Sequence, residues 1–320
     1  MTLSRVTRKQ PCPVCGKPDW CYIFTNGQRA ICMRVAAGSI KPTRGGGYIH
    51  VLQENYRPFN SHNRRPLDIY RPLPNKESTI AAVEVRHAVY SALLESSTLA
   101  ARHADSLIAR GISEDSITRN LYASAPIPTA IIADLARRFN LSGVPGFYRE
   151  QGEWKLVYTQ RRGFFIPIRD AQERIQALQF RCDEGEQRYL WVSSRGSPAG
   201  ATSGAPIHFS SPYLTHLKPN SRVWITEGAL KADAISDQLQ NTVIAVAGVN
   251  AFSEGLAGDL KTSLHTLTTI CIAFDADSDS NPAVARALER LANHLFLGGL
   301  HVQIARWSEA YGKGLDDLLA

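Results

Sequence analysis

The sequence predicts a multidomain α+β protein: a small cysteine-rich module, then an antiparallel sheet, then a Rossmann-like α/β domain. Three observations support this fold class. Four cysteines cluster within the first 32 residues, and β-rich runs separated by turn residues fill the middle of the chain. From residue 222 onward, strand-like and helical stretches alternate. A length of 320 residues leaves room for two or three domains.

The cysteine module is expected to span residues 1–52 and to hold zinc. Its pattern is C-x2-C-x5-C-x10-C, formed by Cys12, Cys15, Cys21 and Cys32. A turn-borne pair, completed by two cysteines from a small hairpin around residues 26–27, can form a tetrahedral sulfur shell, so the zinc would be structural. A pair of disulfides and an iron–sulfur cluster are the alternatives.

The charge of the chain is concentrated at its amino end. Residues 1–76 hold 13 Lys/Arg against three acids, a formal +10, whereas the remainder carries −3. This distribution favours a polyanionic partner, although a solvated, flexible basic arm would look the same. Aromatic side chains near the cysteines would either stack on unpaired bases or form the core of the module. They are Trp20, Tyr22 and Phe24, beside Lys17, Arg29 and Arg34.

Neither a membrane span nor a secretory signal is expected. No apolar stretch approaches the roughly 20 residues that a span needs. The first residues, MTLSRVTRKQ, lack the apolar central region of a signal peptide. We therefore expect a cytoplasmic protein without a membrane partner.

The rest of the chain divides by composition. Residues 53–77, rich in Pro, Asn and Arg, read as a linker. Residues 78–143 read as a helical connector, in which Ser113 is a candidate N-cap. Residues 144–219 contain the β-rich runs of a basic, antiparallel subdomain, and residues 220–320 contain the alternating α/β pattern, which predicts a parallel, doubly wound sheet.

Acidic residues follow two strands of this last domain. Glu227 ends the first strand, and Asp275, Asp277 and Asp279 follow the third. Ligands bind at the carboxyl ends of parallel strands, where several carboxylates together would need a cation such as Mg²⁺ or Mn²⁺. Glu227 could alternatively act as a general base. Separate acids that only cap helices would give the same pattern.

Three segments of this domain resemble the TOPRIM domain, which DnaG-type primases, topoisomerases and some nucleases share. They are WITEGALKADAI, AVAGVNAF and IAFDADSD. The resemblance implies that Glu227, Asp275 and Asp277 are the catalytic, metal-binding acids, that Asp279 extends the metal site and that Lys231 meets phosphate. Gly248 matches the glycine of the motif.

The middle of the chain is similar to the RNA polymerase core of DnaG-type primases. The segment is GFFIPIRDAQERIQALQFRCDEGEQRYLWVSS. The resemblance implies that Arg169, Arg181 and Arg188, with Tyr189, face template or nucleotide phosphates. Strand arginines could instead form ordinary surface salt bridges.

Together these resemblances imply a DNA-dependent primase of the phage or plasmid replication type. It would synthesise short primers on single-stranded DNA from nucleoside triphosphates by nucleotidyl transfer with two divalent ions. A replicative helicase is a further candidate partner. A TOPRIM nuclease and a non-catalytic DNA-binding module of a replication initiator are the alternatives.

Two features depart from chromosomal primases. The cysteine spacing differs, and the sequence ends at GKGLDDLLA without the helicase-interaction domain expected of those primases. Asp316 and Asp317 in this segment either resemble the acidic end of the phage and plasmid group or close the last helix. The sequence has no G-x4-G-K-[ST] motif, which argues against ATPase activity within these residues.

Overall fold

The computed structural model describes residues 3–25, 27–43, 47–52, 78–210, 222–246, 252, 255–264, 267, 269–276 and 281–319. The chain forms two compact units, residues 1–75 and 76–320, and each is described by itself. The linker predicted at 53–77 lies outside the described residues. Among the helices that are described, none is both long and apolar enough to cross a membrane.

The first unit is a small antiparallel sheet built around the cysteines. Its strands lie in the order β1-β2-β3-β5-β4, with bounds Leu3–Arg5 (β1), Tyr22–Phe24 (β2), Arg29–Cys32 (β3), Lys41–Pro42 (β4) and Tyr48–Val51 (β5). The predicted hairpin is present as the antiparallel pair β2 and β3. Val6, Ile23 and Ala30 form the core of this unit with three of the cysteines.

The second unit begins with helices that cover an antiparallel sheet. The helices are α1 (Val83–Glu95), α2 (Ala101–Ile108), α3 (Glu114–Asn120) and α4 (Thr129–Arg138). The predicted cap of α3 is confirmed, because the Ser113 side chain accepts a hydrogen bond from the backbone N–H of Ser116 at 3.3 Å. Such a cap satisfies one of the unpaired N–H groups at the start of the helix.

The antiparallel sheet has the strand order β11-β10-β9-β6. Its strands are β6 (Ala123–Ser124), β9 (Gly163–Arg169), β10 (Ile175–Cys182) and β11 (Tyr189–Trp191). Two details differ from the sequence interpretation. β6 belongs to the segment expected to be only a helical connector. The first strands of the predicted β-rich subdomain form a separate hairpin, β7 (Phe147–Glu150) with β8 (Glu153–Leu156).

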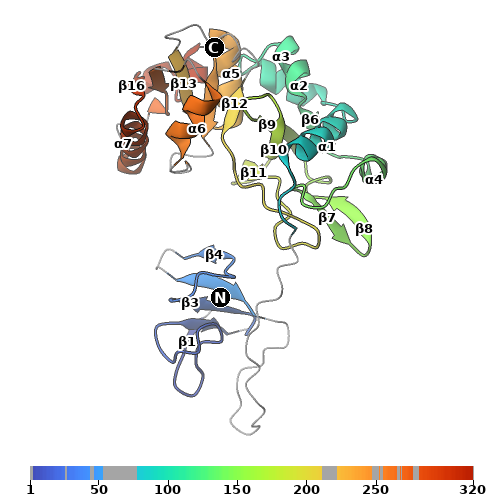
Figure 1. The fold of residues 1–320 in the computed structure, drawn as a ribbon, viewed down its shortest axis with the longest axis vertical. Helices are drawn as coiled ribbons and strands as arrows, with labels where there is room; N and C mark the ends of the chain where they lie inside the picture. The colour runs from blue at the N-terminus through green and yellow to red at the C-terminus, as the bar shows by residue number, and fades with distance from the viewer. Residues whose placement is uncertain are drawn as a thin grey trace. The chain divides into compact units, whose positions relative to one another are not determined.

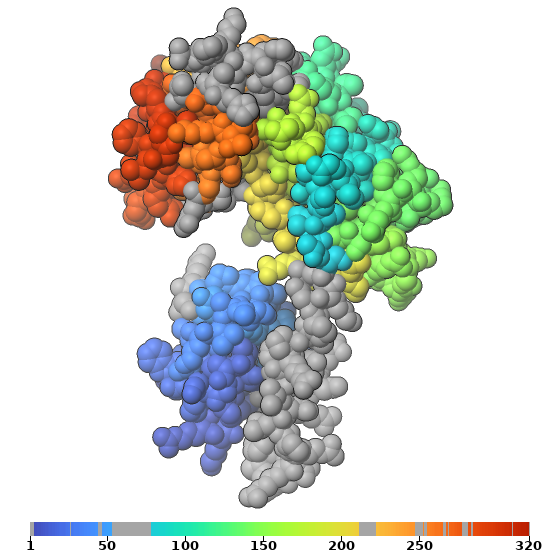
Figure 2. Space-filling model, in the orientation of Figure 1, coloured from blue at the N-terminus to red at the C-terminus, as the bar shows by residue number. Residues whose placement is uncertain are grey.

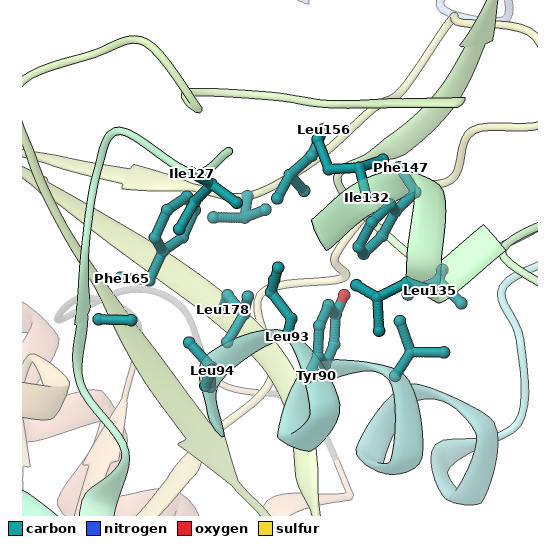
Figure 3. Packing of buried hydrophobic residues seen from close by; sticks show 14 of the residues in the cluster. Tyr90, Leu93, Leu94, Ile127, Ile132, Leu135, Phe147, Leu156, Phe165 and Leu178 are labelled. Atoms are coloured by element: carbon teal, nitrogen blue, oxygen red, sulfur yellow. The ribbon is translucent and has the colours of Figure 1, made fainter. Parts of the chain in front are cut away.

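One apolar cluster joins this sheet to α1 and α4 (Figure 3). Figure 3 shows Leu93 and Leu94 of α1 facing Leu178 of β10, while Leu135 of α4 closes the cluster on the other side. Tyr90 is fully buried in the cluster, and its hydroxyl donates to the carbonyl oxygen of Pro145 at 2.8 Å. A buried tyrosine needs such a partner for its polar end. The connector and the sheet therefore share one core.

The carboxyl-terminal part is a five-stranded sheet of order β12-β14-β13-β15-β16. Figure 1 labels β12, β13 and β16 in this part of the chain, which is coloured from yellow to red. β13, β14, β15 and β16 are parallel, and β12 is an antiparallel edge strand. The bounds are His208–Ser210 (β12), Arg222–Glu227 (β13), Val243–Val246 (β14), Thr269–Ile272 (β15) and His301–Ile304 (β16). The predicted parallel sheet is thus present, extended by a strand that the sequence placed in the preceding subdomain.

Helices cover both faces of this sheet. They are α5 (Ala229–Leu239), α6 (Leu256–Ser263), α7 (Pro282–Leu297) and α8 (Leu315–Leu319), with a 3₁₀ turn at Glu309–Tyr311. Side chains of α6 and α7 form one buried cluster with the sheet, and side chains of α5 and α8 form another. β14 is buried along its whole length, as expected for a strand with helices on both sides.

A further cluster joins α5 to the antiparallel sheet. Ala229, Leu230 and Ala234 of α5 pack with Phe164 and Ile166 of β9. These residues are buried, and Figure 2 shows only the surface above them, where the yellow-green antiparallel part lies beside the orange α6. This packing fixes α5, which begins two residues after Glu227, against the antiparallel sheet.

Candidate catalytic site and zinc module

Glu227 is the last residue of β13, at the carboxyl end of the central strand of the parallel sheet. It lies opposite Val246 of β14, and its side chain is partly exposed. Gly228 follows with φ of 82°, and α5 starts at the next residue. A positive φ is strained for residues with a Cβ atom, so glycine suits this sharp turn from strand to helix. The turn places a carboxylate beside the positive end of an 11-residue helix.

Asp275 reaches the same edge of the sheet from the neighbouring strand. β15 ends at Ile272, but the backbone N–H of Ala273 still donates to the carbonyl oxygen of Ile225 at 2.8 Å. The chain therefore stays beside β13 as it approaches Asp275. Asp277 and Asp279, the other predicted acids of this segment, lie outside the described residues, as does Gly248.

Two lysines pair with the Asp275 carboxylate. Lys231, on the first turn of α5, donates from Nζ to Asp275 Oδ1. Lys313 Nζ lies 3.6 Å from Asp275 Oδ2, and its side chain is 68% exposed. The backbone of Lys313 also accepts a hydrogen bond from Ala276 N–H at 2.9 Å, which ties the final segment to the end of β15. The sequence interpretation named Lys231 but missed Lys313.

Asp316 and Asp317 have different roles at the start of α8. Asp317 Oδ2 accepts from the Gly314 N–H at 2.8 Å and so caps the helix, as one of the two sequence interpretations expected. Asp316 is only 4% exposed, and its Oδ1 has no hydrogen-bond partner among the described residues. Its Oδ2 lies 3.4 Å from Nη1 of Arg110, two residues after the end of α2.

The surroundings of Asp316 link it to the strand-end residues. A Cβ atom on Gly314 would overlap Asp316 Oδ1 and lie 3.0 Å from Lys231 Nζ, so both groups lie against this glycine. Burial raises the pKa of Asp316, and the charge of Lys231 acts in the opposite direction. We refer to Glu227, Lys231, Asp275, Lys313 and Asp316 as the strand-end cluster.

The donor chemistry of the strand-end cluster suits a hard divalent cation. Carboxylate oxygens are the ligands that Mg²⁺ and Mn²⁺ prefer. The buried Asp316 Oδ1 is an acceptor that such an ion, or a water molecule bound to it, could satisfy. Among the described residues, however, only the four cysteines form a group as compact as a metal shell. The described acids alone do not form such a group, and the Lys231 ammonium lies among them.

The predicted nucleic-acid residues lie on β9, β10 and β11. Arg181 is directly opposite Tyr189 in the β10–β11 ladder, so both side chains share one face of the sheet. The Arg181 guanidinium also lies 5.5 Å from the centre of the Phe164 ring. Tyr189 is 40% exposed, and Arg188 is exposed.

Arg169 has a different environment. Its guanidinium donates to the carbonyl oxygens of Glu173, Arg119 and Asn120 at 3.0 to 3.3 Å. Two of these carbonyls end α3, so Arg169 satisfies acceptors that have no partner within that helix. The structure gives Arg169 a stabilising role that the sequence did not indicate, and its contact with nucleic acid stays a prediction.

The four cysteines form a compact sulfur cluster. All four Sγ atoms lie within 4.8 Å of one another, which fits the tetrahedral shell of a zinc ion. Burial raises the pKa of the Cys12 and Cys21 thiols. Burial acts in the same direction on Cys15, but a hydrogen bond from the Lys17 backbone and the other cysteines lower its pKa to about 7. Zinc would stabilise all four as thiolates and release their protons.

Arg34 supports the cluster from outside. Its Nη1 donates toward Cys21 Sγ at 3.7 Å and Cys15 Sγ at 3.9 Å. Asp19 holds the guanidinium through an ion pair of 2.8 Å. Trp20, beside Asp19, is 64% exposed, so the core interpretation of this residue is wrong. The sequence interpretation noted Arg34 only as a candidate nucleic-acid contact.

The fold is that of DnaG-type primase cores, with a four-cysteine module at the amino end. The Aquifex aeolicus primase, in a structure of its zinc-binding and RNA polymerase domains, is similar with a TM-score of 0.58 at 15% identity. The match covers 75% of this chain and 58% of that one, so the chain spans less than two thirds of the Aquifex structure.

Two further structures show the same fold. A primase domain from Pseudomonas aeruginosa has a TM-score of 0.54 at 18% identity, covering 73% of this chain and 74% of that one. A DnaG primase catalytic domain bound to single-stranded DNA has a TM-score of 0.55 at 15% identity, with coverages of 74% and 74%. Residues 214–320 match the family model described as "Domain of unknown function (DUF3854)". No curated protein matches the chain.

Proposed function

We propose that this protein is a DNA-dependent primase of the phage or plasmid replication type. The observation that carries the proposal is that Glu227 and Asp275 lie at the carboxyl ends of two adjacent parallel strands, in the sheet of a DnaG-type fold. One structure of similar fold is a DnaG primase catalytic domain bound to single-stranded DNA. The proposed template is therefore single-stranded DNA, and the proposed substrates are nucleoside triphosphates.

Each part of the site has a task in this proposal. A divalent metal held by Glu227, Asp275 and Asp277 would neutralise the triphosphate and polarise the α-phosphate. The N-terminus of α5, beginning after Gly228, presents unpaired N–H groups to phosphate oxygens. The primer 3′-hydroxyl would attack the α-phosphate and pyrophosphate would leave, so no protein nucleophile is needed.

The basic sheet would bind the template and nucleotides. Arg181 and Tyr189 lie on one face of β10 and β11, and Arg188 is exposed beside them. A cation next to an aromatic ring suits contact with a phosphate and a neighbouring base. Trp20 and the basic residues of the zinc module would add a second contact with unpaired bases.

Primer synthesis tests the proposal directly. The native protein, given labelled nucleotides and a panel of single-stranded templates with Mg²⁺ or Mn²⁺, should produce short labelled oligonucleotides. Glu227→Gln and Asp275→Asn should lower the rate by about a hundredfold or more, since each removes a charge that stabilises the transition state, while template binding measured by fluorescence anisotropy stays unchanged. Native rates in either variant would overturn the site assignment.

Two other outcomes would change the function. Metal-dependent cleavage of labelled DNA in the absence of nucleotides would show a nuclease. Template binding without incorporation of any nucleotide would show a DNA-binding module of a replication initiator.

A further inference from the structure

Lys231 lies among the acids where the proposed function requires a cation. Its side chain is 18% exposed, and its Nζ pairs with Asp275 Oδ1. On its other side the ammonium lies against Gly314, next to the buried Asp316. The helix α5 anchors the backbone of Lys231, because the hydrophobic residues on either side of it, Leu230 and Ala232, are buried. The ammonium is therefore held in place.

Lys313 differs from Lys231, although both pair with the same carboxylate. Its side chain is 68% exposed, and its Nζ lies 3.6 Å from Asp275 Oδ2. Solvent screens an exposed pair far more than a partly buried one. Oδ2 of Asp275 therefore remains accessible to another cation, while Oδ1 is occupied by Lys231.

Among the described residues, fixed cations lie beside the carboxylates of the cluster and offset their charge. The three described carboxylates of the cluster are Glu227, Asp275 and Asp316. Against them stand Lys231 and Lys313 at Asp275, and Arg110 at Asp316. A second divalent ion would also lie close to the Lys231 ammonium, and like charges in a partly buried site repel strongly.

We propose that Lys231 is a built-in cation that supplies the charge of one of the two divalent ions, so that the strand-end cluster binds a single ion. This inference rests on the proposed function, which gives the cluster its divalent metal. Asp275 Oδ2 and Glu227 are the described groups that would hold that ion. An ammonium has three N–H donors, so Lys231 can bind a phosphate oxygen while it stays paired with Asp275.

A titration with Mn²⁺ alone tests this inference without nucleotide or DNA. The full chain, with its zinc module loaded, is titrated while free Mn²⁺ is measured by electron paramagnetic resonance. We expect one bound Mn²⁺ per native chain, and its loss in Asp275→Asn would assign it to this site. Lys231→Met should either bind a second Mn²⁺ or bind the first at least tenfold more tightly.

Two matched variants separate charge from structure. Lys231→Arg keeps the charge and should keep the native stoichiometry, whereas Lys313→Met removes an exposed charge from the same carboxylate and should change the affinity less than threefold. Far-UV circular dichroism and the melting temperature confirm that each variant is folded. If Lys231→Met does not fold, the number of Mn²⁺ ions bound by the native protein and by Lys231→Arg still tests whether the cluster binds a single ion.

The results that overturn the inference are distinct from those that overturn the function. Two Mn²⁺ ions, or none, at this site of the native protein would contradict the built-in cation, and so would native affinity and stoichiometry in folded Lys231→Met. A protein that binds one Mn²⁺ but makes no primers would refute the primase proposal alone. A protein that makes primers and binds two would refute only the inference.

Discussion

The Asp233 carboxylate of α5 accepts a hydrogen bond from His208 Nε2 of β12 at 3.0 Å. Its second oxygen accepts from the Tyr122 hydroxyl at 2.6 Å. His208 Nδ1 in turn accepts from the backbone N–H of Arg169 at 3.0 Å, so the ring is neutral with its proton on Nε2. Asp233 thus ties α5 to β12 and to the segment after α3, and His208 extends this link to Arg169 at the end of β9. Lys231 lies on α5, two residues before Asp233.

Replacement of Asp233 by Asn should destabilise the second unit. The amide has only one acceptor oxygen for two buried donors, so the free energy of unfolding should fall by about 2 kcal/mol. Urea denaturation followed by tryptophan fluorescence measures this. Asp134→Asn, at an exposed carboxylate on α4, is the control and should change stability much less. Equal effects of the two substitutions would show that the buried network does not hold α5.

His103 should make the stability depend on pH. Its Nδ1 accepts from the Ser124 hydroxyl at 2.6 Å, and its Nε2 donates to Asp183 at 2.9 Å. Burial lowers the pKa of His103 below its ordinary value near 6.5, despite the opposing effect of Asp183. The imidazolium is thus less stable in the folded protein than in the unfolded chain. Stability should be complete above pH 6.5 and fall as the pH drops through the folded-state pKa.

Urea midpoints at several values between pH 8 and pH 5 test this dependence. His103→Gln should be less stable than the native protein at pH 8, by about 1 kcal/mol, because its hydrogen bonds are poorer. It should also lose less stability toward pH 5. Parallel pH profiles for the two proteins would contradict the assignment to His103.

Arg34 should strengthen zinc binding without being a ligand. Its donors contact two ligand sulfurs, and partners of metal ligands typically contribute about tenfold or more to affinity. Arg34→Leu should therefore release zinc to a chelator at about tenfold lower chelator concentration. Arg29→Leu, an exposed arginine of the same module, is the matched control. Unchanged zinc release in Arg34→Leu would leave Arg34 with no role at the metal.

Gly314 and Gly258 should respond in opposite ways to alanine. A Cβ atom at Gly314 would overlap Asp316, so Gly314→Ala should displace Asp316 or Lys231 and lower primer synthesis about tenfold or more. A Cβ atom at Gly258, inside α6, meets nothing within 4 Å. Gly258→Ala should therefore keep full activity and stabilise the helix by about 0.5 to 1 kcal/mol. Native activity in Gly314→Ala would show that the close contact is not needed.

The sequence determined those features that depend on local pattern. Four cysteines in one short segment fix the zinc module, because their spacing alone lets them converge. The alternation of apolar strands and amphipathic helices after residue 222 predicts the parallel sheet, since strands covered on both faces must be apolar throughout. The acids Glu227 and Asp275 could be placed near strand ends because each directly follows one of these apolar runs.

Only the tertiary structure decided which distant residues meet. Lys231 and Asp275 are 44 positions apart, and the buried Asp316 comes from a short terminal helix. β12 joins the parallel sheet and β6 joins the antiparallel one, although neither strand is long enough to give a clear periodic pattern. Local patterns encode the type of an element, whereas its neighbours depend on the path of the whole backbone. The charge balance of the strand-end cluster therefore became visible only once the chain was folded.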